Sequence, residues 1–240
     1  MPKRPTEASP PAPAKAVSRA WLAPVIVFFV SLSVYVRSMH PGAAPADSSE
    51  LVAAAHLVGA AHPPGYPLFC ITYKIASLLI PVFGVAWRMN LFNALVTAAA
   101  AAVIACTSVR LTSSVPAAVF SGLLYALCES SWHFALHAEV FALNNLATAT
   151  AMFLLLRFVE TPTQLGCLLG AHAFCIGLAN QHTIVLLLPP VAAAVMMRGA
   201  SICFTRSTIS QLGVAALLGA SLYLCAHPHA AMSCSCLVRA

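Results

Sequence analysis

The chain has 240 residues, of which 60% are hydrophobic and only 8% are charged, and its mean hydropathy is +0.88. A soluble domain carries about a quarter charged residues, so this composition excludes a water-soluble globular protein and predicts an all-α polytopic membrane protein. The net charge of +6 comes from basic residues that stand singly between apolar segments. Such residues set orientation in a bilayer, and they do not indicate nucleic-acid binding.

The first part of the chain predicts a tail, a membrane span and a short helix. Residues 1–19 are rich in Pro and Ala and are predicted to be a disordered cytosolic tail. Residues 20–36 form the first span, and its start is predicted to be cytosolic because basic residues precede it. Residues 48–60 then indicate a short helix in the first outer loop, capped by Asp47 or Ser48.

Residues 67–85 decide the topology, because they are apolar but are interrupted by Pro81 and Gly84. If this segment crosses the membrane, the arginines of the later loops fall outside, against the positive-inside bias; if it lies along the outer interface, they are cytosolic. We predict the second arrangement, which gathers the polar groups on the outer side. The clearer spans are predicted at about 91–109, 114–128, 140–158, 164–179, 183–197 and 208–226.

This arrangement predicts a transmembrane unit over residues 20–226, with about seven spanning helices and interfacial helices in the first outer loop. Residues 227–240 show neither periodicity nor hydrophobic length. We therefore expect an unstructured C-terminal tail there, such as the end of a truncated product would have.

Two of the six acidic residues, Asp47 and Glu50, lie just after the first span. They are three positions apart, so they share a face if a helix begins at or before Asp47. One carboxylate would then serve as general base on an acceptor hydroxyl while the other orients it, and both are candidate catalytic residues. The alternative is a helix cap with an acid in the first turn, which only stabilises the helix.

A rigid corner follows in His62-Pro63-Pro64-Gly65-Tyr66-Pro67. Three prolines restrict the backbone and lower the entropy lost when a loop is ordered, which suits the wall of a preorganised site. His62 and Tyr66 are therefore candidate residues for binding a substrate. The alternative is a plain turn between two interfacial helices.

A second polar stretch lies at residues 129–139, where His133 and His137 are four positions apart. With Glu139 they could bind a metal, but the stretch lacks the glutamate that follows the first histidine in zinc-protease helices, and no third ligand is evident. We predict no metal site. Glu139 is instead expected to hydrogen-bond a sugar or a phosphate group.

Three further residues fall on the outer side in this topology. Asn180 and His182 lie in a polar turn between two spans, and this turn is as consistent with a simple connection as with a ligand contact. Arg88, just before the second span, could face an anionic group, although long basic side chains often only extend toward the interface. The sequence has no glycine-rich phosphate loop and no G-x-S-x-G elbow, so no nucleotide or other cofactor is predicted.

Five segments together resemble one known family: Asp47–Leu51, Ala61–Leu68, Ala86–Asn90, Ala138–Asn144 and Gly177–Thr183. Their order and spacing resemble the transmembrane protein 260 family of protein O-mannosyltransferases, which belong to the glycosyltransferase C superfamily. The resemblance covers roughly residues 20–225. The family's loop reads Gly-Asp-Ser-Gly-Glu, and here Ala46 and Ser49 replace the two glycines.

The resemblance implies a glycosyltransferase C-type module in the endoplasmic-reticulum membrane, with a cytosolic N-terminus. It also implies dolichyl phosphate mannose as the lipid-linked donor, and Ser or Thr of folded extracellular domains of the IPT type as acceptor. By the superfamily's pattern, the catalytic acid of the first lumenal loop corresponds to Asp47. Family members are longer than this chain, so an inactive truncated product is one alternative. A multispan transporter or channel subunit is the other, although its ionisable residues would line a path near the bilayer midplane.

Overall fold

The computed structural model describes the backbone of residues 19–237 and the side chains of residues 19–222. The predicted tail over residues 1–19 therefore lies outside the described residues, apart from its last residue. The first half of the described chain contains α1 (Leu22–Ser38), α2 (Asp47–Leu57), α3 (Pro67–Leu79), α4 (Val85–Thr112), α5 (Val115–Leu127) and α6 (Glu129–Ala135). The second half contains α7 (Val140–Glu160), α8 (Gln164–Leu178), η2 (His182–Leu187), α9 (Leu188–Ala194), η3 (Val195–Gly199), α10 (Ala200–Cys203) and α11 (Arg206–Leu237).

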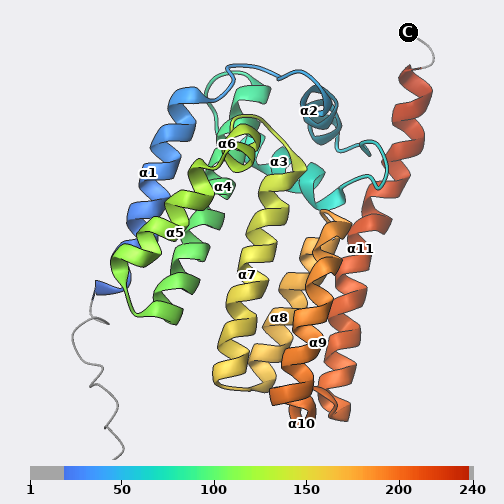
Figure 1. Cartoon of the computed structure of the whole chain (residues 1–240). Helices are drawn as coiled ribbons and strands as arrows, with labels where there is room; N and C mark the ends of the chain where they lie inside the picture. The colour runs from blue at the N-terminus through green and yellow to red at the C-terminus, as the bar shows by residue number, and fades with distance from the viewer. Residues whose placement is uncertain (1–18, 238–240) are drawn as a thin grey trace, which may run out of the picture.

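The helices form a bundle with two distinct ends (Figure 1). The elements that run lengthwise are α1, α4, α5, α7, α8, the continuous run from η2 to α10, and α11. The α2 end carries α2, α3 and α6, whereas the opposite end carries the turns α4–α5, α7–α8 and α10–α11. Within the described part of the chain this is an all-α membrane protein, and its lengthwise elements are those that the sequence predicts.

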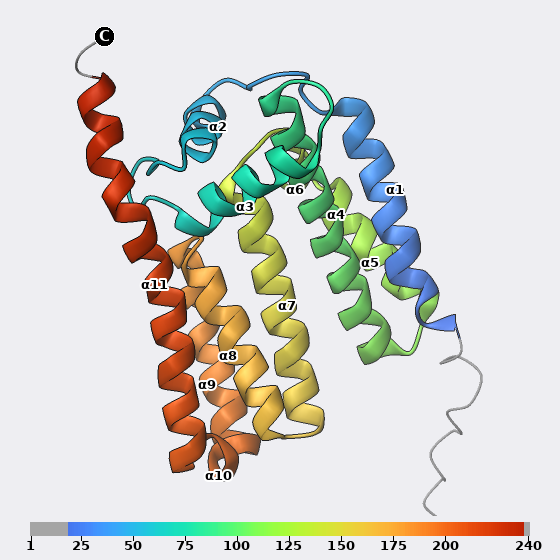
Figure 2. The ribbon, with the colours of Figure 1, turned by 180° about the vertical axis from the view of Figure 1, so that it is seen from behind.

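By length and composition, three helical runs among the described residues could each cross a membrane: α4, α7 and His182–Cys203. The shorter apolar helices are α1, α3, α5 and α8. Of these, α3 lies across the α2 end instead of along the bundle (Figure 2). This orientation agrees with the interfacial position predicted for residues 67–85.

Small residues bring the first helices close together. Ala23 and Val27 of α1 are fully buried against α4 and α5, and Gly122 of α5 fits only because it lacks a side chain: a Cβ atom there would lie 2.8 Å from the Val27 side chain. Membrane helices associate largely through such close backbone approach, since lipid removes most of the hydrophobic driving force between them. The tightly packed α1–α4–α5 unit supports the α2 end from below.

The arginines of the later loops gather at the opposite end, as the interfacial position of α3 requires. Arg110 and Arg157 lie in the last turns of α4 and α7, and Arg206 begins α11. Arg110 contacts Glu160 through Nη2 at 2.6 Å. The acids Asp47 and Glu139 lie at the other end of the bundle, whereas Glu160 is the acid that pairs with Arg110 at this end.

Two parts of the C-terminal half differ from the prediction. The span expected at residues 183–197 is not one regular helix but changes from a 3₁₀ helix to an α-helix at Leu188. Pro189 and Pro190 occupy the first positions of that α-helix, where their missing N–H groups are not needed. The unstructured tail expected over residues 227–240 is wrong as far as Leu237, because α11 continues through it. The helix continues although Pro228 lies within this segment.

Candidate active site

The first acidic residue of the candidate site follows a strained backbone position. Ala46 has φ 64° and ψ −142°, a region that glycine occupies far more readily than residues with a side chain. The chain turns sharply there, and α2 begins at once with Asp47. Asp47 is exposed, and Glu50 lies one turn further on. The positive φ also explains why a glycine in the related loop motif suits this position.

We expect Ala46→Gly to raise the free energy of unfolding by about 1 kcal/mol, because release of strain outweighs the extra entropy of glycine in the unfolded chain. Ser49→Gly is the matched control: Ser49 lies inside α2, so glycine there should lower stability by about 0.5 kcal/mol. Thermal unfolding of both variants in detergent measures the difference. Equal destabilisation by the two substitutions would mean that position 46 is not strained.

Glu50, His62 and Tyr66 form a chain of hydrogen bonds. The Glu50 carboxylate accepts from the backbone N–H of His62 at 2.6 Å and lies 3.1 Å from His62 Nδ1. The Tyr66 hydroxyl lies 3.3 Å from His62 Nε2. With Nδ1–H directed at Glu50, Nε2 is left as the acceptor for the Tyr66 hydroxyl. Both oxygens of Glu50 thus contact His62, and Glu50 thereby fixes the orientation of the corner.

Glu139 is the buried carboxyl of the site and stands directly before α7. It is only 6% exposed. Its backbone N–H donates to Asn93 Oδ1 at 3.2 Å, and its carbonyl oxygen lies 3.3 Å from the Tyr73 hydroxyl. His137 Nε2 lies 3.8 Å from the nearer Glu139 carboxyl oxygen. The carboxyl therefore sits in a closely packed setting that has little water.

Burial and neighbouring charges shift the pKa values of Glu139 and His137 in opposite directions. Burial, and then the negative charge of Asp47, raise the pKa of Glu139 from its ordinary 4.5 to about 7. Burial and the neighbouring His133 and His40 lower the pKa of His137 to about 4, so His137 is neutral near pH 7 and its contact with Glu139 is no ion pair. Burial, Asp47 and Glu139 also raise the pKa of Tyr66. A carboxyl pair with one buried and one exposed member can hold a single proton near neutral pH.

Two hydrogen bonds bring the polar turn that contains Asn180 and His182 to the same end. The Leu68 N–H donates to the Ala179 carbonyl at 3.2 Å, and Asn180 Nδ2 donates to the Val140 carbonyl at 2.8 Å. Asn180 is fully buried, so it supports the start of α7 from within. His182 begins η2 and is exposed. Of the predicted site residues, Asp47, Glu50, His62, Tyr66 and Glu139 lie in one electrostatic neighbourhood, and Asn180 lies beside it.

Arg88 lies elsewhere. Its Nε donates to the carbonyls of Val82 and Phe83 at 2.9 and 3.0 Å, and its Nη1 donates to the Ser77 carbonyl at 3.0 Å. These contacts tie the guanidinium to the last turn of α3 and the α3–α4 loop, whereas the corner is at the first turn of α3. In this structure the Arg88 guanidinium donates to backbone carbonyls and is therefore not directed at a site where it could bind an anionic group.

The histidines of this end pack against one another. The His133 and His40 rings lie 5.3 and 5.7 Å from the His137 ring, centroid to centroid, in edge-to-face pairs. Among the residues that the structure describes, no three His, Cys, Asp or Glu side chains are placed to hold one metal ion. The absence of a metal remains a prediction from the sequence.

Comparison with known proteins assigns the chain to a family. Residues 47–202 match the family described as "Protein O-mannosyl-transferase TMEM260 N-terminal domain". The chain belongs to this family. The match begins at the first acid of the site and continues through the elements that place Glu139 and Asn180, and it confirms the resemblance seen in the sequence motifs.

Two relatives of this TMEM260-family chain indicate how much of a longer protein it represents. It is 36% identical over 166 residues to the mouse "Protein O-mannosyl-transferase TMEM260", which covers 68% of this chain and 24% of the mouse protein. It is 29% identical over 227 residues to the Dictyostelium discoideum "Protein O-mannosyl-transferase tmem260", which covers 88% of this chain and 28% of that protein. The chain thus spans about a quarter of the length of these curated relatives. No solved structure matches it.

The sequence reading of this TMEM260-family chain missed three residues of the site: Tyr73, Asn90 and Asn93. All three are buried, and Asn93 contacts both the backbone of Glu139 and the Tyr73 hydroxyl. A signal was present, because amides inside an apolar membrane helix are unfavourable unless they are paired and often mark a functional region. Asn90 and Asn93 are such amides in α4.

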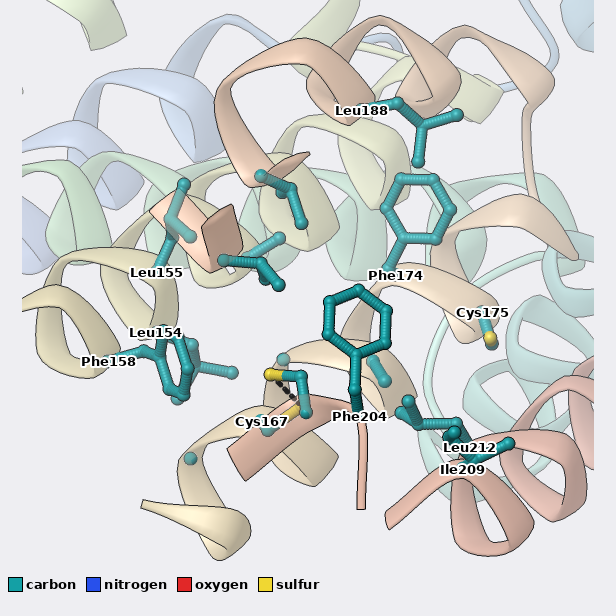
Figure 3. Close-up of a pocket in the computed structure, with 17 residues that line it drawn as sticks. Leu154, Leu155, Phe158, Cys167, Phe174, Cys175, Leu188, Phe204, Ile209 and Leu212 are labelled. Atoms are coloured by element: carbon teal, nitrogen blue, oxygen red, sulfur yellow. Dashed lines mark hydrogen bonds between the residues drawn. The ribbon is translucent and has the colours of Figure 1, made fainter. Parts of the chain in front are cut away.

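An apolar cavity of about 380 Å³ lies between α7, α8, α9 and α11 of this TMEM260-family chain. Figure 3 shows Phe174, Phe204 and Leu188 directed into it, and the thiols of Cys167 and Cys203 lie 3.1 Å apart at its wall. Its lining includes Phe158 near the end of α7, and Phe204 and Ile209 around the start of α11, so it lies toward the opposite end from the carboxyls. The cavity is therefore separate from the candidate active site.

Proposed function

We propose that this chain carries the catalytic end of a protein O-mannosyltransferase of the endoplasmic-reticulum membrane. The donor would be dolichyl phosphate mannose, and the acceptor a Ser or Thr hydroxyl of a folded extracellular domain of the IPT type. Family membership supports the transferase class, and donor, acceptor and compartment follow the family resemblance. The N-terminus would be cytosolic, which the arginines at the opposite end of the bundle favour under the positive-inside bias.

One observation carries the proposal: an exposed carboxylate, Asp47, lies in the field of a buried carboxyl, Glu139, at one end of the bundle. A lipid-linked sugar has its tail in the bilayer and its head at the interface, so a transferase site belongs at the end of the helices. Two carboxyls with different protonation states can divide the roles of base and hydrogen-bond donor.

In the proposed reaction, Asp47 takes the proton of the acceptor hydroxyl while the oxygen of that hydroxyl forms a bond to the anomeric carbon of mannose. The bond between that carbon and the phosphate oxygen breaks, and the lipid phosphate leaves from the opposite face with the electron pair. A single displacement inverts the configuration at that carbon. Protonated Glu139 donates a hydrogen bond to the sugar or the departing phosphate, and His62, Tyr66 and His182 are proposed to line the donor site.

Glu50 and Arg88 take modified roles in this proposal. Because both Glu50 oxygens bond to His62, Glu50 serves as a positioning residue that fixes the imidazole, and through it Tyr66. Asn180 acts likewise through the start of α7. Arg88 would reach the donor only if the α3–α4 loop released it.

The deciding experiment separates donor binding from transfer. This chain in nanodiscs is expected to be stabilised against heat by dolichyl phosphate mannose but not by dolichol, because the proposed site is at the interface and recognises the phosphosugar head. The full-length mouse relative, with the same donor and a folded IPT domain, tests transfer. Equal shifts with both lipids would contradict the proposed site, and flux of a solute through the chain in liposomes would support the transporter alternative instead.

A further inference from the structure

Two amides on α4 have no part in the proposed proton transfer, yet they lie at the centre of the site. Asn90 and Asn93 are both 0% exposed and stand three positions apart, so they share one face of the helix. A side-chain amide has two N–H donors and an oxygen acceptor, and leaving these unpaired in an apolar bundle is unfavourable. Their partners therefore show what this face of α4 holds.

Asn93 holds the backbone just before α7. Its Oδ1 accepts from the Glu139 N–H at 3.2 Å and from the hydroxyl of Tyr73, whose oxygen lies 3.3 Å from the Glu139 carbonyl oxygen. Its Nδ2 donates to the Phe134 carbonyl at 2.7 Å. One amide thus joins α3, the end of α6 and the residue before α7.

Asn90 makes the corresponding contacts one turn earlier. Its Oδ1 accepts from the Ala138 N–H at 2.9 Å, and its Nδ2 donates to the carbonyls of His40 and Gly42, each at 2.9 Å. These bonds fasten the loop that leads from α1 toward Asp47 to the segment that carries Glu139. The two carboxyls of the site are therefore tied to the same helix face, although they are distant in sequence.

We propose that Asn93 is a positioning residue of the transferase site, which holds the Glu139 carboxyl in a fixed place relative to Asp47 through its hydrogen bond to the Glu139 N–H. This inference rests on the proposed function. Glu139 has an extended backbone, with φ −147° and ψ 151°, so no helical hydrogen bond fixes its N–H group. A displacement of about 1 Å in a reacting group can change a rate 100-fold, which makes such a support consequential.

The groups that face Glu139 come from several elements, and they decide what its release would do. They are Asp47 of α2, His62 and Tyr66 of the corner, Tyr73 of α3, and His137 of its own loop. Burial is the largest cause of the raised pKa of Glu139. If the support is lost, water reaches the carboxyl and its pKa falls toward the ordinary value.

The first test uses Asn93→Leu, which keeps the approximate shape and removes every hydrogen bond. The matched control is Thr97→Val, one turn further along α4, where the buried hydroxyl bonds only to the Asn93 carbonyl of its own helix. In nanodiscs, amide hydrogen exchange of residues 134–140 should become about tenfold faster in Asn93→Leu and stay unchanged in the control. Unchanged exchange in Asn93→Leu would overturn the inference.

The second test measures the pH dependence of transfer in the full-length mouse relative with substitutions at the aligned positions. We expect the basic limb of the Asn93→Leu profile to move about one pH unit lower, because Glu139 then ionises more easily. A merely structural role would lower the rate by the same factor at every pH. If Asn93→Leu does not fold, Tyr73→Phe removes one bond of the same network and should move the limb in the same direction.

The outcomes separate this inference from the proposed function. An unchanged limb in Asn93→Leu, with transfer abolished by Asp47→Asn, would refute the positioning role and leave the transferase site in place. Full transfer by Asp47→Asn would refute the site itself, whatever Asn93→Leu does. A shifted limb together with loss of transfer in Asp47→Asn supports both.

Discussion

Asp47→Asn should lower mannose transfer by about 100-fold to 10,000-fold, the usual contribution of a general base. Asparagine keeps the size of aspartate but cannot take a proton at neutral pH. Donor binding by this chain should change little, because the proposed base acts on the acceptor hydroxyl. The measurement is initial rate against donor concentration in the full-length mouse relative, with the substitution at the aligned position.

Glu129→Gln is the matched control for the loss of an acid at this end of the molecule. Glu129 is exposed in the first turn of α6, at the same end of the bundle, and takes no part in the hydrogen bonds that join the corner to α7. Its neutralisation should leave transfer within about twofold of the parent, since surface substitutions away from a site have small effects. Near-normal turnover of a folded Asp47→Asn protein would falsify the assignment of Asp47 as base.

The outline of the fold was predictable because a bilayer imposes length and charge rules on the sequence. Spans such as α7, over Val140–Glu160, follow from hydropathy, and the position of α3 follows from where the later arginines must lie. Asp47 and Glu139 stood out because acids are scarce in this chain, and His62 stood out because it opens the proline-rich corner. The approach of these three residues to one another is the main feature of the site.

What escaped prediction depends on the path of the loops and not on residue type. Arg88 is satisfied by one carbonyl in the last turn of α3 and two in the α3–α4 loop, and no sequence pattern gives the directions of these groups. Glu50 was expected to assist Asp47, but the corner returns to α2 so that His62 takes both of its oxygens. Asn93 resembles any polar residue in an apolar helix until the segment before α7 is placed against it.

The pH dependence of Glu139 gives the second large effect. Between its ordinary pKa of 4.5 and its pKa of about 7 in this structure, the folded protein retains a proton that the unfolded chain has lost. The stabilisation that comes from keeping Glu139 protonated is therefore complete below pH 4.5 and is lost as the pH rises through 7. At pH 8 an ionised carboxylate would have to stay buried beside Asp47, or the segment would have to open.

Transfer should consequently fall about tenfold per pH unit above pH 7. The ionised carboxylate cannot donate a hydrogen bond, and its negative charge repels the departing phosphate. Glu139→Gln keeps an N–H donor that does not titrate, so its profile should lack this basic limb while its rate near pH 6 stays within about tenfold of the parent.

Between pH 5 and pH 8, the parent chain in detergent should also lose on the order of 2–3 kcal/mol more stability than the variant, since each pKa unit corresponds to ~1.4 kcal/mol. Asp47 and His137 remain in both proteins, so the difference between them isolates the buried carboxyl. A basic limb that persists unchanged in Glu139→Gln would assign that ionisation to another group and leave Glu139 with a packing role alone.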